Sequence, residues 1–237
     1  MMQVLEIHNL RGGYIPELDI LQGIHLSLNE GEVVGVIGLN GSGKSTLGKA
    51  IMNMIPRIEG EIKYCGYPIM HLDTHQLAQL GIAIMQQGGQ VFNTMSVWEN
   101  LQLAFGDKKN DEYVAVLKEI LPLLSRPKKE LQCTMADKLS GGQRHQLALA
   151  MTLACQPKLA ILDEPSAGLS PKSVEVMYQI LQQVRARLDV TMVLIEQNIA
   201  KTIAFCDRSI LLEQGTIAHE FTDATLADIE KIMFNKK

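Results

Sequence analysis

One segment, residues 33–46, reads VVGVIGLNGSGKST and says more about the architecture than any other part of the chain. Its continuous apolar beginning predicts a buried strand over Glu32–Ile37, while Ser45–Ile55 predicts a helix that Pro56 ends. Between the two lies a glycine-rich loop of the pattern GxxxxGK[ST]. This pattern indicates a phosphate-binding loop when it follows a strand and opens a helix, as it does here.

The residues of this loop suit the phosphates of a nucleotide. Its glycines allow the backbone to curl so that successive N–H groups point at phosphate oxygens, and the following helix directs its positive end at them. Lys44 supplies a mobile charge to the β- and γ-phosphates during catalysis, Ser45 offers a hard oxygen ligand to Mg²⁺, and Thr46 is expected at the α-phosphate. The residues expected to bind the nucleotide are Gly38, Leu39, Asn40, Gly41, Ser42, Gly43, Lys44, Ser45 and Thr46.

The segment LAILDE, residues 159–164, is an apolar strand that ends in two carboxylates. Because such a strand is expected in the same sheet as the strand before the loop, we expect Asp163 near the metal, acting through the water shell of Mg²⁺. Glu164 follows by one residue. It is the candidate catalytic base that polarises the water attacking the γ-phosphate.

The segment LSGGQ, residues 139–143, places a serine and two glycine amides at a predicted helix N-terminus, which makes a second receptor for a γ-phosphate. With this segment the chain resembles the ATP-binding cassette (ABC) ATPases, and the resemblance covers essentially the whole chain, with all motifs in the family order. It implies ATP and Mg²⁺ as cofactors, and a head-to-tail homodimer or a heterodimer with a paralogous ATPase. In such a dimer, the ATP of the partner chain is bound by Ser140, Gly141, Gly142 and Gln143.

Three further positions take their roles from this resemblance. Tyr14 resembles the aromatic residue that stacks on adenine. The metal-contacting glutamine should follow the strand Ile82–Met85, where Gln86 and Gln87 are both candidates and the spacing of the family positions favours Gln87. Gln197 stands where most of the family has a switch histidine of the catalytic site. Its amide can contact the γ-phosphate but cannot carry a proton or a positive charge.

The glutamine that stands in place of the histidine points to one branch of the ABC ATPases. Together with Gly81-Ile82 and the run SAGLSP at residues 166–171, the segment EQN at residues 196–198 resembles the ATPase subunits of the branched-chain amino acid importers and their amide and urea relatives. Gly89, where those proteins often have arginine, and the segment from Thr222 onward depart from that pattern. The resemblance implies integral membrane permease subunits as partners and, indirectly, a solute-binding protein.

These patterns predict an α/β protein: a P-loop NTPase (RecA-like) core with an N-terminal antiparallel β subdomain and an inserted helical subdomain. One ABC ATP-binding domain is expected over residues 1–237, with the catalytic core at 1–89 and 158–237 and the helical signature subdomain at about 90–157. Capping-box spacing at residues 96–99 and 140–143 marks two helix starts inside that helical segment.

The composition argues against several other classes of protein. The chain has 237 residues, 46% of them apolar and 20% charged, which is typical of a globular protein. Its 22 Lys and Arg against 26 Asp and Glu give a net charge of −4, so no nucleic-acid partner is expected. Its apolar runs are far shorter than the roughly 20 residues of a membrane span, and no leader pattern precedes them. We expect a cytoplasmic protein that is peripheral on the inner face of the cell membrane.

Two alternatives stay open at the level of sequence. A soluble ABC-type ATPase in cofactor assembly, DNA repair or ribosome-associated work has the same fold, although this chain carries one cassette and no coiled-coil insertion. A P-loop kinase or GTPase would lack the LSGGQ segment. The sequence decides neither the transported solute nor import against export, nor whether the dimer pairs two copies or a copy and a paralogue.

Overall fold

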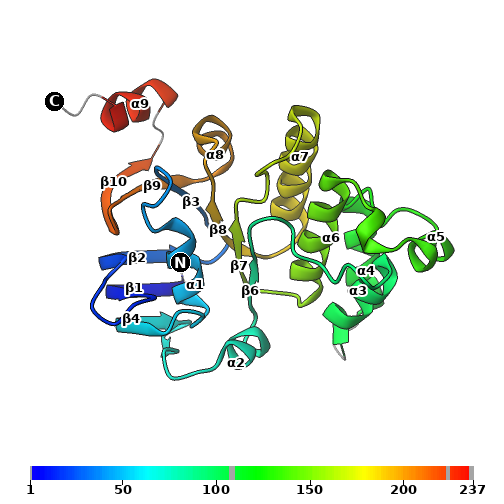
Figure 1. Ribbon diagram of the computed structural model, residues 1–237, viewed down its shortest axis with the longest axis horizontal. Helices are drawn as coiled ribbons and strands as arrows, with labels where there is room; N and C mark the ends of the chain where they lie inside the picture. Colours follow the sequence, from blue (N-terminus) through cyan, green and yellow to red (C-terminus); the bar gives the residue numbers. More distant parts are fainter. Residues whose placement is uncertain (1, 107–109, 223–224, 235–237) are drawn as a thin grey trace. The chain divides into compact units, whose positions relative to one another are not determined.

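The computed structural model describes residues 2–106, 110–222 and 225–234, and the chain divides into two compact units. The first unit comprises residues 1–77 and 191–237, and the second comprises residues 78–190. Each unit combines strands with helices (Figure 1), which confirms the predicted α/β class. In the described ranges no helix is both long enough and apolar enough to cross a membrane.

An antiparallel sheet forms the N-terminal part of the first unit, as the sequence predicts. Strand β1 (Gln3–Gly13) pairs with β2 (Leu21–Asn29) on one side and with β4 (Arg57–Tyr64) on the other, and β4 pairs with the short β5 (Tyr67–Pro68). Burial alternates along most of β2, as expected for a strand with one face on a core and the other in water. The loop that carries Tyr14 joins β1 to β2, so the β1–β2 pairing brings its two ends together.

The second sheet of this unit has the strand order β10–β9–β3–β8. Strand β3 (Val33–Ile37) lies between β8 (Thr191–Ile195) and β9 (Arg208–Glu213) and is parallel to both, while β10 (Thr216–Thr222) returns antiparallel to β9. Every residue of β3 is buried, as its continuous apolar sequence predicts. The glycine-rich loop therefore runs from the carboxyl end of an interior strand into α1 (Lys44–Ile51), the edge where α/β sheets bind ligands.

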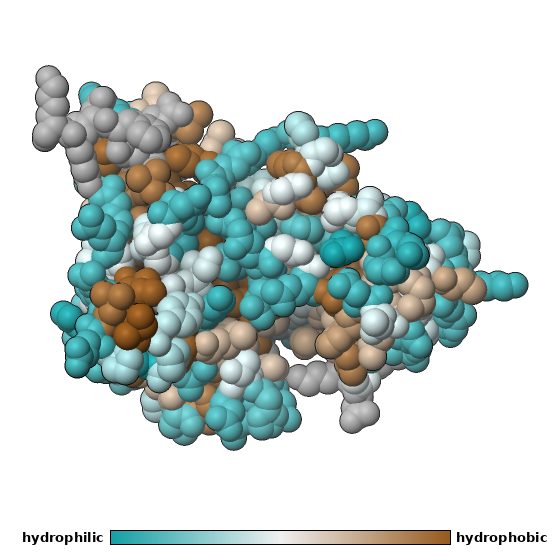
Figure 2. All heavy atoms as spheres, viewed as in Figure 1, coloured by the Kyte–Doolittle hydropathy of each residue, from teal (hydrophilic) through white to brown (hydrophobic). Residues whose placement is uncertain are grey.

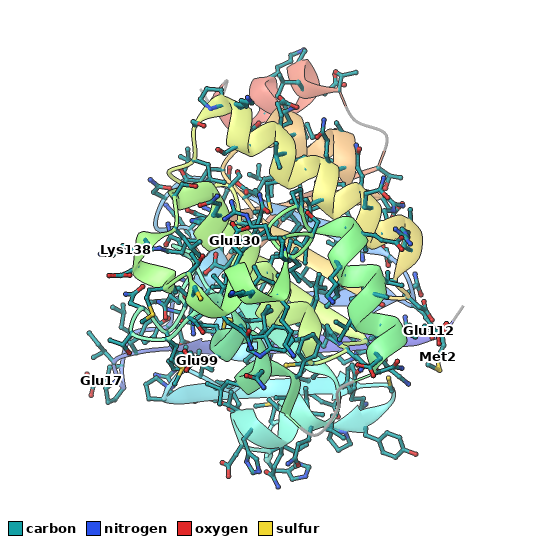
Figure 3. The ribbon with its side chains drawn as sticks, turned by 90° about the vertical axis from the view of Figure 1, so that its right-hand side faces the viewer. Met2, Glu17, Glu99, Glu112, Glu130 and Lys138 are labelled. Carbon is teal, nitrogen blue, oxygen red and sulfur yellow. The ribbon has the colours of Figure 1, made fainter. Side chains whose placement is uncertain are left out.

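The second unit combines a short parallel strand pair with helices. Strands β6 (Ile82–Met85) and β7 (Leu159–Asp163) run parallel, with Met85 opposite Leu162. Figure 3 looks onto its helical part, where Glu99, Glu130 and Lys138 are labelled. The predicted capping boxes form at Ser96 with Glu99 and at Ser140 with Gln143. The helices are α3 (Val97–Phe105), α4 (Asp111–Ile120), α5 (Lys128–Cys133), the 3₁₀ turn η2 (Ala136–Lys138), α6 (Gly141–Ala154) and α7 (Pro171–Arg187), after α2 (Thr74–Gln79) at the boundary of the two units.

Helix α1 ends one turn earlier than the sequence pattern predicts, at Ile51. Asn53 has a left-handed φ of 53°, and its N–H donates to Ala50 O at 2.9 Å, while Met54 N donates to Lys49 O at 2.8 Å. These two bonds form a Schellman closure, which terminates a helix wherever a residue with positive φ follows it. The prediction that Pro56 ends the helix is therefore wrong, because Asn53 has already ended it.

The C-terminal elements are not predicted by the sequence pattern. They are β10 and α9 (Leu226–Phe234), whereas α8 (Ile199–Phe205) forms within the segment of about 198–205 that the pattern predicts to be helical. Ile229 of α9 is fully buried in a cluster with Ile37 and Leu211. Because Ile37 is the last residue before the glycine-rich loop, α9 packs on the strand end from which the loop departs.

Candidate functional site

The glycine-rich loop of the first unit has the backbone conformation that phosphate binding requires. Gly38, Gly41 and Gly43 have φ angles of 153°, 81° and 103°, which residues with a side chain rarely adopt. A Cβ at Gly38 would lie 2.3 Å from Leu212 O and 2.8 Å from Ser42 Oγ, so this glycine also allows a close approach of the backbone. Gly43 is the N-cap of α1, and in the described part of the chain no side chain caps this helix. The N–H groups at the start of this helix are therefore not capped by a side chain, which is the arrangement that suits an anion.

Lys44 lies inside the curl of the loop. It is 4% exposed, and its Nζ donates to Gly38 O at 2.8 Å and to Leu39 O at 3.0 Å. These two bonds hold the ammonium group where it can meet phosphate oxygens. Ser45 is half-buried and Thr46 is buried in the first turn of α1. The structure therefore brings together the predicted loop residues from Gly38 to Thr46.

The turn between β9 and β10 supports the glycine-rich loop, and no sequence pattern noted above predicts it. Gly215 N donates to Ser42 O at 3.0 Å, and Gln22 N donates to Gly215 O at 2.8 Å. Gln214 and Gly215 have φ angles of 46° and 79°, as in the turns of two-residue hairpins. A Cβ at Gly215 would lie 1.9 Å from Ile20 O, so only glycine fits. A Gly after a predicted strand was the signal that would have found this turn.

Tyr14 lies on a loop that is tied to the antiparallel sheet. Tyr14 is 44% exposed, and the Nζ atom of Lys49 lies 5.9 Å from the centroid of its ring. Arg57 donates to Pro16 O at 2.7 Å and forms an ion pair with Asp19, so one guanidinium fixes two points of the loop. Tyr14 is therefore held but accessible, as a residue that stacks on a flat ligand must be.

The same loop exposes apolar surface next to Tyr14. Ile15 and Leu18 are 60% and 57% exposed, and Leu18 N donates to Ile15 O at 3.1 Å. Figure 2 shows a compact hydrophobic patch over the ends of β1 and β2, surrounded by mainly hydrophilic residues. An aromatic ring with apolar neighbours suits contact with a flat, weakly polar ring such as a purine base.

Gln197 follows β8 at the sheet edge that carries the loop. Because β8 is parallel to β3, with Ile195 opposite Val36, the residues that follow the two strands emerge at the same edge. Gln197 is exposed, and its N–H donates to Glu196 Oε2 at 3.1 Å. Asn198 caps the first turn of α8 with its side chain. Tyr14, the glycine-rich loop and Gln197 therefore all belong to the first unit.

The second unit brings Gln87 and Glu164 into contact. They follow the parallel strands β6 and β7, and Gln87 Nε2 donates to Glu164 Oε2 at 2.6 Å. Asp163 and Glu164 are 2% and 5% exposed, and Glu164 has a left-handed φ of 49°. Of the two neighbouring glutamines, it is Gln87 that makes this bond. The bond uses the amide nitrogen, so the amide oxygen can serve another partner, such as a cation.

The LSGGQ residues form the start of α6 in the second unit. Ser140 Oγ accepts from Gln143 N at 3.3 Å, and Gln143 Oε1 accepts from Ser140 N at 3.0 Å. Gly141 is exposed, and a Cβ at Gly142 would lie 3.0 Å from Ser173 Oγ of α7. The capping box fixes the backbone of these residues, and the two glycines leave their amides uncovered by side chains of their own.

The chemistry of the predicted metal ligands fits Mg²⁺. Ser45 in the first unit supplies a hydroxyl, and Gln87 and Asp163 in the second supply an amide oxygen and a carboxylate. Mg²⁺ prefers such hard oxygen ligands and is usually held by one or two carboxylates together with phosphate oxygens and water. The three side chains therefore match the ion by type.

Comparison with known proteins identifies relatives along almost the whole chain. The family model described as ABC transporter matches residues 21–167. The high-affinity branched-chain amino acid transport ATP-binding protein BraG of Pseudomonas aeruginosa is 34% identical, over 92% of this chain and 93% of its own. The probable branched-chain amino acid transport ATP-binding protein LivF of Archaeoglobus fulgidus is also 34% identical, over 96% of both chains. The lipopolysaccharide export system ATP-binding protein LptB of Escherichia coli is 30% identical, over 88% of this chain and 87% of its own.

Solved structures give the same result for the fold. The ADP conformation of MJ1267, an ATP-binding cassette of an ABC transporter, superposes with a TM-score of 0.81 at 26% identity, covering 100% of this chain and 96% of that chain. The ATP-binding cassette MJ0796, in a dimeric post-hydrolysis state bound to ADP and phosphate, has a TM-score of 0.79 at 25% identity, covering 94% and 100%. These similarities confirm the predicted P-loop NTPase fold with its N-terminal antiparallel sheet and inserted helices.

Proposed function

Because the chain belongs to the ABC transporter family, whose ATP-binding cassettes are ATPases that power transport, we propose that it drives the import of branched-chain amino acids or related amides. One observation supports this choice of solute. The similarity to two branched-chain amino acid transport proteins extends over more than nine-tenths of every chain compared. The glutamine at position 197, in place of a histidine, agrees with that branch of the family.

Each site residue takes a role in ATP hydrolysis under this proposal. The N–H groups of the glycine-rich loop and the Lys44 ammonium bind the β- and γ-phosphates, and Tyr14 stacks on the adenine. Glu164 accepts a proton from the attacking water as the water oxygen bonds to the γ-phosphorus, and the bond from that phosphorus to the β–γ bridging oxygen breaks, which releases phosphate and ADP. Gln197 donates its amide N–H to a γ-phosphate oxygen.

Magnesium supplies charge neutralisation at the phosphates when it is bound. Ser45, Asp163 and Gln87 are the residues that would hold it. The bond from Gln87 Nε2 to Glu164 Oε2 orients the amide, which presents its oxygen rather than its nitrogen to a cation. This bond also gives the Glu164 carboxylate a fixed direction before water arrives.

We also propose the partners that such a machine needs. The LSGGQ residues Ser140 to Gln143 bind the ATP of a second cassette, either another copy of this chain or a paralogue. Permease subunits in the membrane receive the motion of the dimer, and a solute-binding protein delivers the amino acid to them. The chain then works at the inner face of the membrane, with residues 1–89 and 158–237 as its catalytic core and about 90–157 as its signature subdomain.

A second candidate solute follows from the relative that serves lipopolysaccharide export, which is 30% identical to this chain. A cassette of this fold also admits a role outside transport, in cofactor assembly. Both readings predict that loss of the chain leaves amino-acid uptake unchanged, and the non-transport reading predicts that no integral membrane protein purifies with it.

The test is uptake of radiolabelled leucine by cells that lack the chain. We expect that the wild-type chain restores uptake, that Lys44→Ala does not, and that glutamate uptake is unaffected throughout. Lys63→Ala is the matched control, because Lys63 pairs with Glu61 on β4 and is not among the predicted site residues. Purification of the tagged chain from native membranes is expected to recover permease subunits. Unchanged leucine uptake in the absence of the chain would contradict the proposal.

A further inference from the structure

His145 is a buried histidine to which the proposed reaction gives no role. It lies in the first turns of α6, two residues after Gln143 of the LSGGQ segment, and is 5% exposed. Its Nδ1 atom lies 2.7 Å from Pro165 O. Because a carbonyl oxygen only accepts hydrogen bonds, Nδ1 carries the hydrogen and donates it. A buried side chain of α6 thus holds the residue that directly follows Glu164.

The backbone at Glu164 needs such support. Its φ of 49° lies in the left-handed region, and residues with a side chain persist there only where their surroundings fix them. Pro165 has no N–H with which to anchor the turn. The turn is held instead by Ala167 N, which donates to Glu164 O at 3.1 Å, and by the bond from His145 to Pro165 O. The direction of the Glu164 side chain therefore depends on where α6 holds Pro165.

The ring of His145 also packs on Gly89, two residues after Gln87. A Cβ at position 89 would lie 2.7 Å from Cδ2 of the ring and 3.2 Å from its Cγ and Nε2. Gly89 is buried, so the ring rests directly on its backbone with no room for a side chain. His145 therefore touches both segments whose side chains form the 2.6 Å bond between Gln87 and Glu164.

We infer that His145 is a positioning residue for ATP hydrolysis, because its bond to Pro165 and its packing on Gly89 set the placement of Glu164 relative to Gln87. The inference rests on the proposed role of Glu164 as the catalytic base. It gives α6, which begins with the LSGGQ residues, a rigid link to Glu164 of the same chain.

The test compares two replacements of His145 in the full-length chain. Asparagine places its amide nitrogen at the position of Nδ1 and keeps the donor to Pro165 O, whereas leucine fills similar space without a donor. Thr152→Val is the matched control, because Thr152 is also a buried polar residue of α6, but its hydroxyl donates to Ala148 O of its own helix. The measurements are kcat and KM for ATP from phosphate release, together with the midpoint of thermal unfolding.

We expect His145→Leu to lower kcat about tenfold, as for the loss of one buried hydrogen bond in the transition state, with KM within twofold of the wild type. His145→Asn should stay within about threefold of the wild type, and Thr152→Val should match it. If leucine leaves no folded protein, His145→Gln replaces it, because glutamine places its amide at the position of Nε2 and should show the same loss. Full turnover by the leucine or glutamine variant, or no recovery with asparagine, would overturn the inference.

A double replacement separates positioning from a general packing role. If His145 acts through Glu164, then His145→Leu in a Glu164→Gln background should change the residual turnover less than twofold. An equal tenfold loss in both backgrounds would show that His145 acts elsewhere. Neither result depends on the solute: failure to restore leucine uptake refutes the proposed function, whereas these rates with purified chain decide the role of His145.

Discussion

Replacing Glu164 with glutamine isolates the catalytic part of the account. Glu164 is 5% exposed, and one of its carboxylate oxygens accepts from Gln87 Nε2 at 2.6 Å. Glutamine has the same shape, and its amide oxygen can accept the same bond, so the fold and ATP affinity should be preserved. Only the capacity to take a proton from water is lost. A positioned base contributes 10² or more in rate, so we expect at least a 100-fold fall in kcat, about 2.7 kcal/mol of activation free energy.

The assay is phosphate release in a single turnover, which separates the chemical step from ADP release. Size-exclusion chromatography with ATP and Mg²⁺ should show a dimer that accumulates in Glu164→Gln and is transient in the wild type. Glu99→Gln is the matched control. Glu99 is exposed on α3 (Figure 3), and a glutamine keeps its capping box with Ser96, so this variant should hydrolyse ATP at the wild-type rate.

Turnover by Glu164→Gln within threefold of the wild type, with ATP binding intact, would refute the role of Glu164 as the base. Another group would then be the base. A variant that lost ATP affinity and thermal stability together would also contradict it, because the isosteric change would then have disturbed the bond to Gln87 rather than the chemistry.

Three further predictions follow from single contacts. Gly38→Ala places a Cβ 2.3 Å from Leu212 O, so we expect a loss of about 2 kcal/mol in unfolding free energy and at least tenfold weaker ATP binding, measured by calorimetry. Gly66→Ala, with a φ of 80° and no neighbour within 4 Å of its Cβ, should cost less stability and leave binding unchanged. Gln197→Ala should lower ATP turnover about tenfold, whereas Gln197→His should keep the wild-type rate. If both variants keep the wild-type rate, Gln197 does not belong to the site. Burial, with a smaller effect of Cys155, raises the pKa of Tyr113 to about 12. Because its folded pKa lies above the unfolded value, stability should be full below pH 10 and fall as the pH rises toward 12, and Tyr113→Phe should flatten that slope in urea unfolding.

The parts of the fold that sequence predicts are those with a strong local pattern. The apolar run of β3 and the loop after it define a strand, a turn and a helix from neighbouring residues alone. The two capping boxes form as their spacing predicts, because Ser140 and Gln143 need only each other. Spacing favours Gln87 over Gln86 as the metal-contacting glutamine; the structure adds the bond from Gln87 to Glu164, and the contact with a metal stays a prediction.

The parts that sequence does not predict depend on distant partners. The early end of α1 comes from Asn53, whose side chain also donates to Met70 O and Leu72 O, nearly twenty residues away. The support of the loop by Gly215 and the link from His145 to Pro165 join segments that only the folded chain brings together. Helix α9 packs through the buried Ile229, with Ile232 beside it, on a cluster that includes Ile37, and no local sequence pattern predicts such a contact.

Transport by the assembled machine tests the central claim most directly. The complex purified through this chain would be placed in liposomes with ATP on the side of the cassettes, and with labelled leucine and the solute-binding protein on the other. We expect leucine accumulation that requires ATP, a rate of phosphate release that rises with leucine, and neither effect with Glu164→Gln. A wild-type complex that hydrolyses ATP while leucine, isoleucine and valine all stay where they were added would contradict it.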